Sequence, residues 1–505
     1  MIKTGFRVTF FLLAAFMMLS VRAYARDYYV AAGGSDLSAG SIEQPFQSLM
    51  RAQDAAVEGD TVYIRGGVYS VFEIAAADPN YNYVHDMTKS GITYRAYPGE
   101  RPVFDFAEVP TNLRVCAFHV RSGVQDVIFE GFDVTGVKVG EQKQSECFRI
   151  EGNASLINMA CYNNEASGFY FNGKRASGEC INCDSYDNIG PTALSIGNID
   201  GFGAHGGKVD FRYCRAWNNS DDGFDCISSF GPVTFDHCWA FDMRAGGDSN
   251  GFKVGGYGRA DASRVPEIVP VHTVKYCIAA ENNSNGFYAN HQPGQAAEWT
   301  YNTAFHNRRG NYNMLECASR EDNTDIPGTR EVLHFNISYN GQITNDNNPP
   351  ESVTDNSWTV EGLTLSDQDF MSLDWTELSL PRQEDGSLPE ISFMRPAEND
   401  KLKGMGCFAE ELFLKWEVSV RQNEYIFDIK ALNYDQNSLF VAALYQEDRL
   451  VGVGSQKYSG TADLRISTQC EVPADMAKLL IWDGLDSIVP LYEAESRPLE
   501  EGPFF

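Results

Sequence analysis

Four aspartates in the middle of the chain could together hold a metal ion. Asp221, Asp222 and Asp225 form a D-D-x-x-D cluster, and Asp200 precedes Asp221 by 21 residues, about one repeat of the chain. Carboxylates this close repel one another unless a cation lies between them, and Ca²⁺ accepts about six to eight oxygen ligands in flexible geometry. We therefore predict that these aspartates bind calcium, although aspartates at solvated turns would give a similar pattern.

A single lysine accompanies this acidic cluster. Lys253 follows Asp225 by 28 residues, one further repeat if an insertion at 244–248 is allowed for, and it stands among Gly251, Gly255 and Gly256. Partial burial beside a bound cation is expected to lower the pKa of a lysine from about 10.4 toward neutrality. Lys253 is therefore a candidate general base, whereas most isolated lysines are solvated charges.

The elements that position these residues are predicted by a recurring phrase that contains cysteine. The phrase repeats at intervals of 22, 31, 24 and 39 residues, and Asn302 replaces the cysteine in a sixth copy, 25 residues after the fifth: Cys161, Cys183, Cys214, Cys238 and Cys277. A base period of about 22–25 residues with insertions is typical of a stacked solenoid. The cysteines should then stack inward as free thiols, with disulfides as the alternative. Cys180 and Cys183 have zinc-like spacing but no second ligand pair.

A second phrase, Gly-Phe flanked by Asn, Ser or Asp, recurs between the cysteine phrases, so each repeat holds two short strands separated by turns. Strands this short bury their faces only against neighbouring coils. We predict an all-β chain whose residues 26–365 form a right-handed parallel β-helix. An amphipathic helix over Ile42–Ala56 is expected to cap its N-terminal end.

The two ends of the chain differ from the solenoid. Lys3, Arg7, an apolar run and Ala23-Tyr24-Ala25 predict a signal peptide over residues 1–25, cleaved after Ala25, and hence a secreted or periplasmic protein. No later segment is apolar enough to span a membrane. Residues 366–407 are rich in proline and acid and should pack along the solenoid. Alternating patterns over residues 408–505 predict a small C-terminal β-sandwich, a spacer rather than a carbohydrate-binding module.

The charge balance excludes several partners. The 505 residues include 40 Lys and Arg against 69 Asp and Glu, for a net charge of −29. Nucleic acids and anionic membranes would be repelled, and a polyanionic substrate would need a local cation. The hydrophobic content of 43% excludes a disordered chain. We expect a monomer.

Over about residues 27–405, which include the four aspartates and Lys253, the chain resembles the family 9 polysaccharide lyases. The resemblance rests on ordered blocks: Gly59-Asp60-Thr61-Val62-Tyr63, Ile199-Asp200-Gly201-Phe202, Asn219-Ser220-Asp221-Asp222-Gly223-Phe224-Asp225, Asn250-Gly251-Phe252-Lys253-Val254-Gly255-Gly256 and Asp385-Gly386-Ser387-Leu388-Pro389. It implies calcium at Asp200, Asp221, Asp222 and Asp225, with Lys253 as the base. It also implies β-elimination of pectic galacturonate polymers, either homogalacturonan or rhamnogalacturonan I.

The departures from this family concern substrate contacts. Relatives often carry lysine where this chain has His205, so that position is a candidate substrate contact and the precise substrate stays open. Arg309 is a second candidate substrate-binding residue. His205, Arg309 or water could protonate the leaving group. Two other functions stay open: a pectic hydrolase with paired aspartates, and a non-catalytic carbohydrate-binding or adhesin protein. The G-x-G-x-x-G match at 201–206 precedes a predicted strand at 208–213, not a phosphate-binding helix.

Overall fold

The computed structural model describes residues 25–244, 246–257, 265–291, 297–397 and 399–409. Within 413–499 it describes all but residues 422, 433, 435–437, 448, 459–462, 471 and 483–489. The predicted signal peptide therefore lies, apart from Ala25, outside the described residues. No helix in the described part of the chain is long and apolar enough to cross a bilayer.

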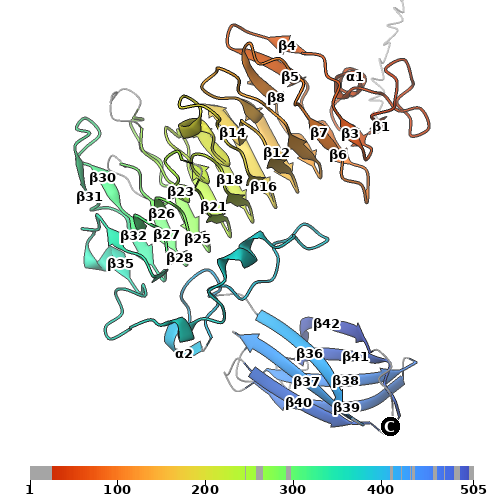
Figure 1. The fold of residues 1–505 in the computed structure, drawn as a ribbon, viewed down its shortest axis with the longest axis vertical. Coiled ribbons are helices and arrows are strands. Elements are labelled where there is room, and N and C mark those ends of the chain that lie inside the picture. The colour runs from red at the N-terminus through yellow and green to blue at the C-terminus, as the bar shows by residue number, and fades with distance from the viewer. Residues whose placement is uncertain are drawn as a thin grey trace, which may run out of the picture.

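A right-handed parallel β-helix occupies most of the chain, as predicted, and its coils stack from red to green in Figure 1. Each coil contributes a strand to each of three sheets. The first sheet contains β1 (Asp27–Val30), β2 (Thr61–Ile64), β6 (Thr93–Ala96), β9 (Val127–Glu130), β12 (Asn153–Ile157), β15 (Ser177–Ile181), β18 (Val209–Arg212), β21 (Val233–Asp236), β24 (Thr273–Lys275), β27 (Glu298–Thr300), β32 (Val332–His334) and β35 (Val353–Thr354).

The second sheet contains β3 (Val68–Tyr69), β7 (Val103–Asp105), β10 (Asp133–Thr135), β13 (Ala160–Tyr162), β16 (Asp184–Tyr186), β19 (Arg215–Trp217), β22 (Trp239–Phe241), β25 (Ile278–Ala280), β28 (Thr303–Phe305) and β33 (Ile337–Tyr339). The third contains β4 (Ala76–Ala77), β5 (Tyr81–Met87), β8 (Arg114–Val120), β11 (Glu146–Ile150), β14 (Ser167–Gly173), β17 (Phe202–Gly206), β20 (Phe224–Asp225), β23 (Phe252–Lys253), β26 (Asn285–Tyr288), β29 (Gly310–Asn313) and β34 (Ile343–Thr344). A hairpin of β30 (Leu315–Cys317) and β31 (Asp325–Pro327) follows β29.

The corners of the coils explain why the cysteine phrase recurs. The residue before each phrase cysteine from Cys183 onward has a positive φ, as at Asn182 (54°) and Tyr213 (54°), and turns the chain into the second sheet. Left-handed backbone is unfavourable for bulky residues. At later corners the outward rings offset part of this cost by stacking at 4.8–5.0 Å between centroids: Tyr213, His237, Tyr276, Tyr301 and Phe335.

The interior of the solenoid is apolar and contains the phrase cysteines, all fully buried. The predicted common position is wrong for Cys161, which pairs with Ser185 in the second sheet, so Met159 takes the corner position that Cys183 takes one coil later. None of the twelve cysteines forms a disulfide, which confirms the prediction of free thiols. Asn302 takes over the cysteine position by donating from Nδ2 to Val274 O and to Asn336 Oδ1. Buried polar groups are tolerated when each finds a partner, so the cysteine row continues as an asparagine row.

The predicted N-terminal boundary of the capping helix, Ile42, is wrong. Helix α1 spans only Leu49–Ala55, and Ser48 caps it by accepting a hydrogen bond from Arg51 N. The preceding residues form a loop because Asp36 accepts hydrogen bonds from the backbone N–H groups of Gln47 and Ser48. Phe46 also pairs with Val30 as an extended bridge. Side-chain capping and burial of Phe46 thus override the amphipathic pattern of Ile42–Ser48.

The short helix η3 (Pro350–Ser352) leads into β35. Residues after β35 run back along the second sheet through the short helices η4 (Asp367–Asp369), η5 (Trp375–Ser379) and α2 (Asn399–Leu402). Arg215 is 3% exposed, pairs with Asp184 and donates to the carbonyls of Leu378 and Leu380. Arg382 from the tail pairs with the same Asp184. These contacts, with an apolar cluster that includes Phe393 and Phe305, hold the tail on the solenoid.

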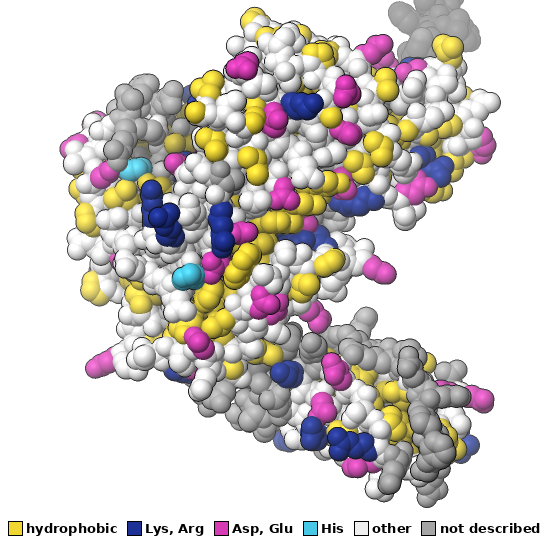
Figure 2. Space-filling view, in the orientation of Figure 1, with side chains coloured by type: hydrophobic (Ala, Val, Ile, Leu, Met, Phe, Trp, Pro, Cys, Tyr) yellow, Lys and Arg dark blue, Asp and Glu magenta, His cyan; other side chains and the backbone are white. Residues whose placement is uncertain are grey.

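The C-terminal module packs two antiparallel sheets on one apolar cluster, as predicted. One sheet contains β36 (Phe413–Arg421), β37 (Glu424–Leu432) and β40 (Asp463–Gln469); the other contains β38 (Leu439–Gln446), β39 (Arg449–Lys457), β41 (Met476–Trp482) and β42 (Pro490–Pro498). Figure 2 shows this module as a separate lobe beside the end of the solenoid.

A buried acid near the C-terminal coils makes stability depend on pH. Glu331 is 1% exposed, and its Oε2 accepts hydrogen bonds from Trp299 Nε1 and Ala297 N, while burial raises its pKa to about 8. In the unfolded chain a glutamate loses its proton near pH 4.3, so the folded state binds more protons between about pH 4.3 and 8. This group therefore destabilises the fold as pH rises through that window.

Glu331→Gln should remove the penalty, because the amide oxygen can still accept both hydrogen bonds. We expect the difference in Tm between variant and wild type to grow in favour of the variant from pH 5 to pH 8. Thermal unfolding followed by circular dichroism measures it, with the exposed Glu298→Gln as the matched control. A difference that stays constant over this range would contradict the prediction.

Candidate active site

Four neighbouring strands of the third sheet, β17, β20, β23 and β26, position the predicted catalytic residues. Phe202, Phe224, Phe252 and Phe287 pair in register and stack inside the solenoid. Side chains alternate along a strand, so the next residue of each strand points outward. Asp225 therefore lies beside Lys253, and Lys253 beside Tyr288. The sequence prediction that Lys253 occupies the position of Asp225 one coil later is confirmed.

The aspartates form two groups that share one member. Ligand oxygens of Asp200, Asp222 and Asp225 lie within 4.8 Å of one another, and so do those of Asp221, Asp222 and Asp248. Asp200 stands two residues before β17, and Asp222 stands two residues before the neighbouring strand β20, so the two aspartates are neighbours in adjacent coils. Asp222 N donates a hydrogen bond to Asp200 Oδ1. In the second group, Asp221 Oδ1 accepts a hydrogen bond from Asp248 N.

The shared aspartate is fully buried and heavily bonded. Asp222 Oδ1 accepts from the backbone and the side chain of Asn250, and Oδ2 accepts from Lys253 Nζ at 2.9 Å. Lys253 Nζ also lies 3.4 Å from Asp225 Oδ2 and 3.2 Å from Asp248 Oδ2. The lysine is 9% exposed, and its ammonium group is the cation nearest to the acidic groups.

Crowding raises the pKa of these acids. Burial, followed by the charges of Asp221, Asp225 and Asp222, raises the pKa of Asp200 well above its usual value. Burial and the charge of Asp222 raise the pKa of Asp221 to about 8. Burial also raises the pKa of Asp222, against the opposing effect of Lys253. One lysine does not balance so many carboxylates, and the site would be stabilised by further positive charge.

In the folded chain alone, the pKa of Lys253 is shifted in the direction opposite to the shift expected beside a bound cation. Burial lowers the pKa of Lys253, but the charges of Asp222, Asp225, Asp221 and Asp200 outweigh burial and hold it well above its usual value. The sequence argument assumed a neighbouring cation, whereas the nearest charges in the folded chain are anionic. Nearby carboxylates favour the protonated amine.

A cleft of about 600 Å³ opens over Lys253, Asp200, Asp221 and Asp225. His205 lines it as predicted; its Nδ1 lies 2.7 Å from the carbonyl oxygen of Ile227, and its ring packs against Tyr170. Since a carbonyl only accepts, Nδ1 carries the proton, and the buried Nε2, which has no hydrogen-bond partner in the described residues, presents a lone pair.

Arg309 does not belong to this cleft lining. It is exposed between β28 and β29, and its backbone N–H donates to Ser284 O. Sequence reasoning missed Lys143 and Lys174, which line the cleft, and Asp248, which contacts Lys253. Aligning the Gly-Phe phrases could have found Asp248, because it stands three residues before Gly251, and the residue three before Gly223 is Ser220, next to Asp221. The two lysines lie in turns that carry no recurrent phrase.

Comparison with known proteins places this site in a family. Residues 28–325 match the family model described as Pel9A-like, right handed beta helix region. Pectate lyase L of Dickeya chrysanthemi is 29% identical over 396 residues, covering 75% of this chain and 86% of the relative. Pectate lyase PEL9 of Emericella nidulans is 27% identical over 427 residues, covering 77% and 96%.

Two solved structures are similar as well. A rhamnogalacturonan lyase superposes with a TM-score of 0.69 at 33% identity, covering 76% of this chain and all (100%) of that chain. The crystal structure of pectate lyase Pel9A superposes with a TM-score of 0.60 at 29% identity, covering 75% and 91%. The similarity spans the solenoid that carries Lys253 and its acidic neighbours.

Proposed function

The chain belongs to the Pel9A-like β-helix family of polysaccharide lyases, family 9, and we propose that it cleaves galacturonate-containing pectic polymers by β-elimination, with Lys253 as the base. The relatives include both pectate lyases and a rhamnogalacturonan lyase, so homogalacturonan and the rhamnogalacturonan I backbone are both candidate substrates. The observation that supports this proposal most directly is the register of Asp225 with Lys253 beneath a cleft.

The chemistry requires removal of a weakly acidic proton. The proton on C5 of a galacturonate unit is α to a carboxylate, and the neutral amine of Lys253 would accept it. The electron pair then forms the C4–C5 double bond while the C4–O bond breaks. Products are a 4,5-unsaturated end and a new chain end whose oxygen takes a proton. His205 could supply that proton only as an imidazolium, with a second proton on Nε2, and water is the alternative donor. Arg309 lies outside the described cleft lining.

We propose calcium as the cofactor of this reaction. The donor set fits, since Asp200, Asp222 and Asp225 offer only carboxylate oxygens, close together, with a raised pKa at Asp200 and Asp222. Asp221 would join through the second group with Asp222 and Asp248. Bound Ca²⁺ would neutralise these carboxylates, favour the neutral form of Lys253 and hold a substrate carboxylate.

The cleft also carries charges of its own that suit a polyanion. Lys143 and Lys174 are exposed and line it together with His205 and the acidic groups. In a chain of net charge −29, cations gathered at one cleft would direct an anionic polymer there. Lys143 and Lys174 are therefore proposed substrate contacts in addition to His205.

One assay tests this proposal against its alternatives. Purified protein is incubated with homogalacturonan and, separately, with rhamnogalacturonan I, each with Ca²⁺ or with excess chelator. We expect ultraviolet-absorbing unsaturated product from at least one polymer, only in the calcium arm. Reducing ends without ultraviolet absorbance would instead indicate a hydrolase, and no product from either polymer would favour a binding or adhesin protein.

The remaining assignments rest on the sequence patterns. We propose that residues 1–25 are a signal peptide and that the protein acts as a secreted or periplasmic monomer. Residues 26–365 would form the catalytic unit, with 366–407 as its packed tail. The sandwich over 408–505 would serve as a structural module.

A further inference from the structure

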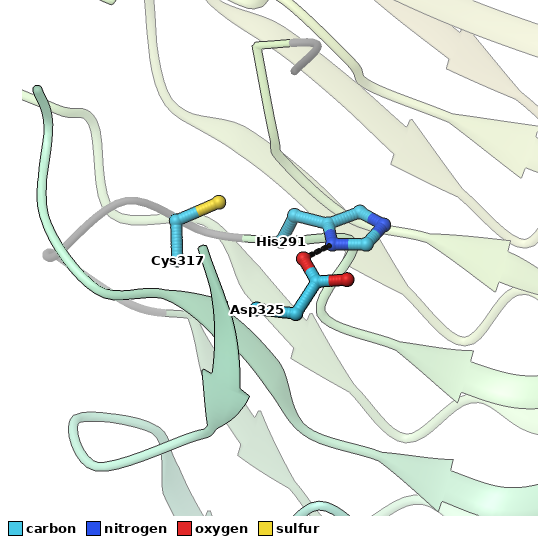
Figure 3. A group of neighbouring side chains, drawn as sticks. All are labelled: His291, Cys317 and Asp325. Atoms are coloured by element: carbon cyan, nitrogen blue, oxygen red, sulfur yellow. Dashed lines mark hydrogen bonds and ion pairs between the residues drawn. The ribbon is translucent and has the colours of Figure 1, made fainter. Parts of the chain in front are cut away.

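A second group of metal-ligand side chains lies away from the aspartates, at the edge of the third sheet (Figure 3). His291 follows β26, while Cys317 and Asp325 belong to β30 and β31. One ligand atom from each of the three lies within 4.8 Å of the others. Figure 3 shows the imidazole of His291 meeting the carboxylate of Asp325, with the Cys317 side chain beside them.

The hairpin presents two of these side chains together. Cys317 and Asp325 are directly opposed in the antiparallel register of β30 and β31, so both point to the same face. On the other side, Asn290 and His291 both have left-handed backbone, with φ of 49° and 57°. Two consecutive residues in this region carry strain, and such strain often marks functional positions. Here the strained turn directs His291 toward the hairpin.

Cys317 differs from the cysteines of the solenoid. The phrase cysteines belong to the apolar core that runs through the coils. Cys317 is 5% exposed and lies on the hairpin, across from an aspartate and next to a histidine. The carboxylate of Asp325 disfavours a thiolate at this position, whereas a bound cation would stabilise it, and the thiolate is the form that binds metals.

The histidine is oriented by a further partner. Its Nε2 lies 2.8 Å from the hydroxyl oxygen of Tyr288, and its Nδ1 lies 2.5 Å from Asp325 Oδ1. With Nε2–H donating to Tyr288, Nδ1 is the atom directed at the group. Metal-binding histidines commonly use their other ring nitrogen in this way, which fixes the tautomer and the ring orientation.

We propose that His291 Nδ1, Cys317 Sγ and Asp325 bind one Zn²⁺. Nitrogen, thiolate and carboxylate donors suit zinc and do not suit calcium, which prefers oxygen alone. Tetrahedral zinc bonds of about 2.0–2.3 Å place ligand atoms about 3.3–3.8 Å apart, so these side chains, whose ligand atoms lie within 4.8 Å of one another, would have to adjust only slightly to close the site. The ion replaces the proton between Nδ1 and Asp325, its charge balances one thiolate and one carboxylate, and water completes the tetrahedron.

The site ties the β30–β31 hairpin to the turn after β26. Tyr288 is the residue of β26 that pairs with Lys253, so the zinc group is joined through His291 to the strand beside the catalytic lysine. Zinc bound here would stabilise the folded state by mass action. This role is independent of which polymer the cleft accepts.

The test uses the full-length protein, stripped with chelator and then supplied with saturating Ca²⁺. Titration with Zn²⁺ by calorimetry should show about one tight site per chain, and Zn²⁺ should raise Tm. Co²⁺ in the same site should give a thiolate-to-metal charge-transfer band in the near ultraviolet. Cys317→Ser should abolish that band, and His291→Ala and Asp325→Asn should each remove the tight site. Tyr288→Phe should weaken zinc binding by about 10–100-fold.

Two control variants separate this site from its surroundings. Asp322→Asn lies in the same hairpin, where its Oδ1 accepts hydrogen bonds from Thr324, and should keep the zinc stoichiometry. Asp222→Asn in the acidic groups should also keep it. A wild-type protein that takes up no Zn²⁺, or a cobalt charge-transfer band that survives in Cys317→Ser, would overturn the proposal. Neither result depends on lyase activity.

Discussion

Lys253→Ala should lower kcat on pectic polymers by about 10²–10⁴-fold, the usual contribution of a positioned general base. The side chain is 11% exposed and lines the cleft, so water cannot easily take over its role. KM and calcium affinity should change much less, since the base acts mainly in the transition state. Initial rates of unsaturated product over a range of substrate concentrations separate the two constants.

Lys253→Arg is the informative companion variant. A guanidinium can keep an ion pair with Asp222, yet it holds its proton at any pH that the enzyme tolerates. If Lys253 is the base, this variant should be nearly as slow as alanine. Recovery of more than about a tenth of wild-type kcat would show that Lys253 only balances charge or binds carboxylate, and the base would then be sought at His205.

Removal of calcium should abolish activity, and loss of a single buried ligand should approach the same result. We expect Asp222→Asn to weaken Ca²⁺ binding by more than about 100-fold, because outer-shell partners alone are worth about 10–100-fold. The amide oxygen can still accept from Asn250, while the amide NH2 group takes the place of the oxygen that accepts from Lys253. Solenoid stability is spread over many coils, so the fold should persist. Calorimetric Ca²⁺ titration and circular dichroism measure the two effects.

The two acidic groups allow a sharper comparison. Asp200 belongs to the group with Asp225, whereas Asp248 belongs to the group with Asp221, and its side chain is 66% exposed. If calcium lies between Asp200, Asp222 and Asp225, Asp200→Asn should weaken binding far more than Asp248→Asn. Equal losses would place the ion nearer to Asp221 and Asp248. Unchanged activity of the wild type in excess chelator would contradict the calcium assignment altogether.

Repetition made much of this protein predictable from its sequence. Each coil reuses the same corner and the same Gly-Phe phrase, so aligning the phrases sets which residues become neighbours. The pairing of Asp225 with Lys253 followed from that alignment, and so did the buried row of Cys183, Cys214 and Cys238. Because neighbouring coils pair in parallel and in register, a spacing in sequence becomes a contact in space.

Tertiary structure decided what the repeat does not encode. Asp221 and Asp222 are adjacent in sequence but have different hydrogen-bond partners: Asp221 accepts from Asp248 N, whereas Asp222 accepts from Asn250 and Lys253. The high pKa of Lys253 arises from the summed charges of four carboxylates, which only the folded arrangement brings within reach. A hairpin that folds back onto a turn with left-handed backbone brings together the side chains of His291, Cys317 and Asp325. The sequence repeat does not predict this contact.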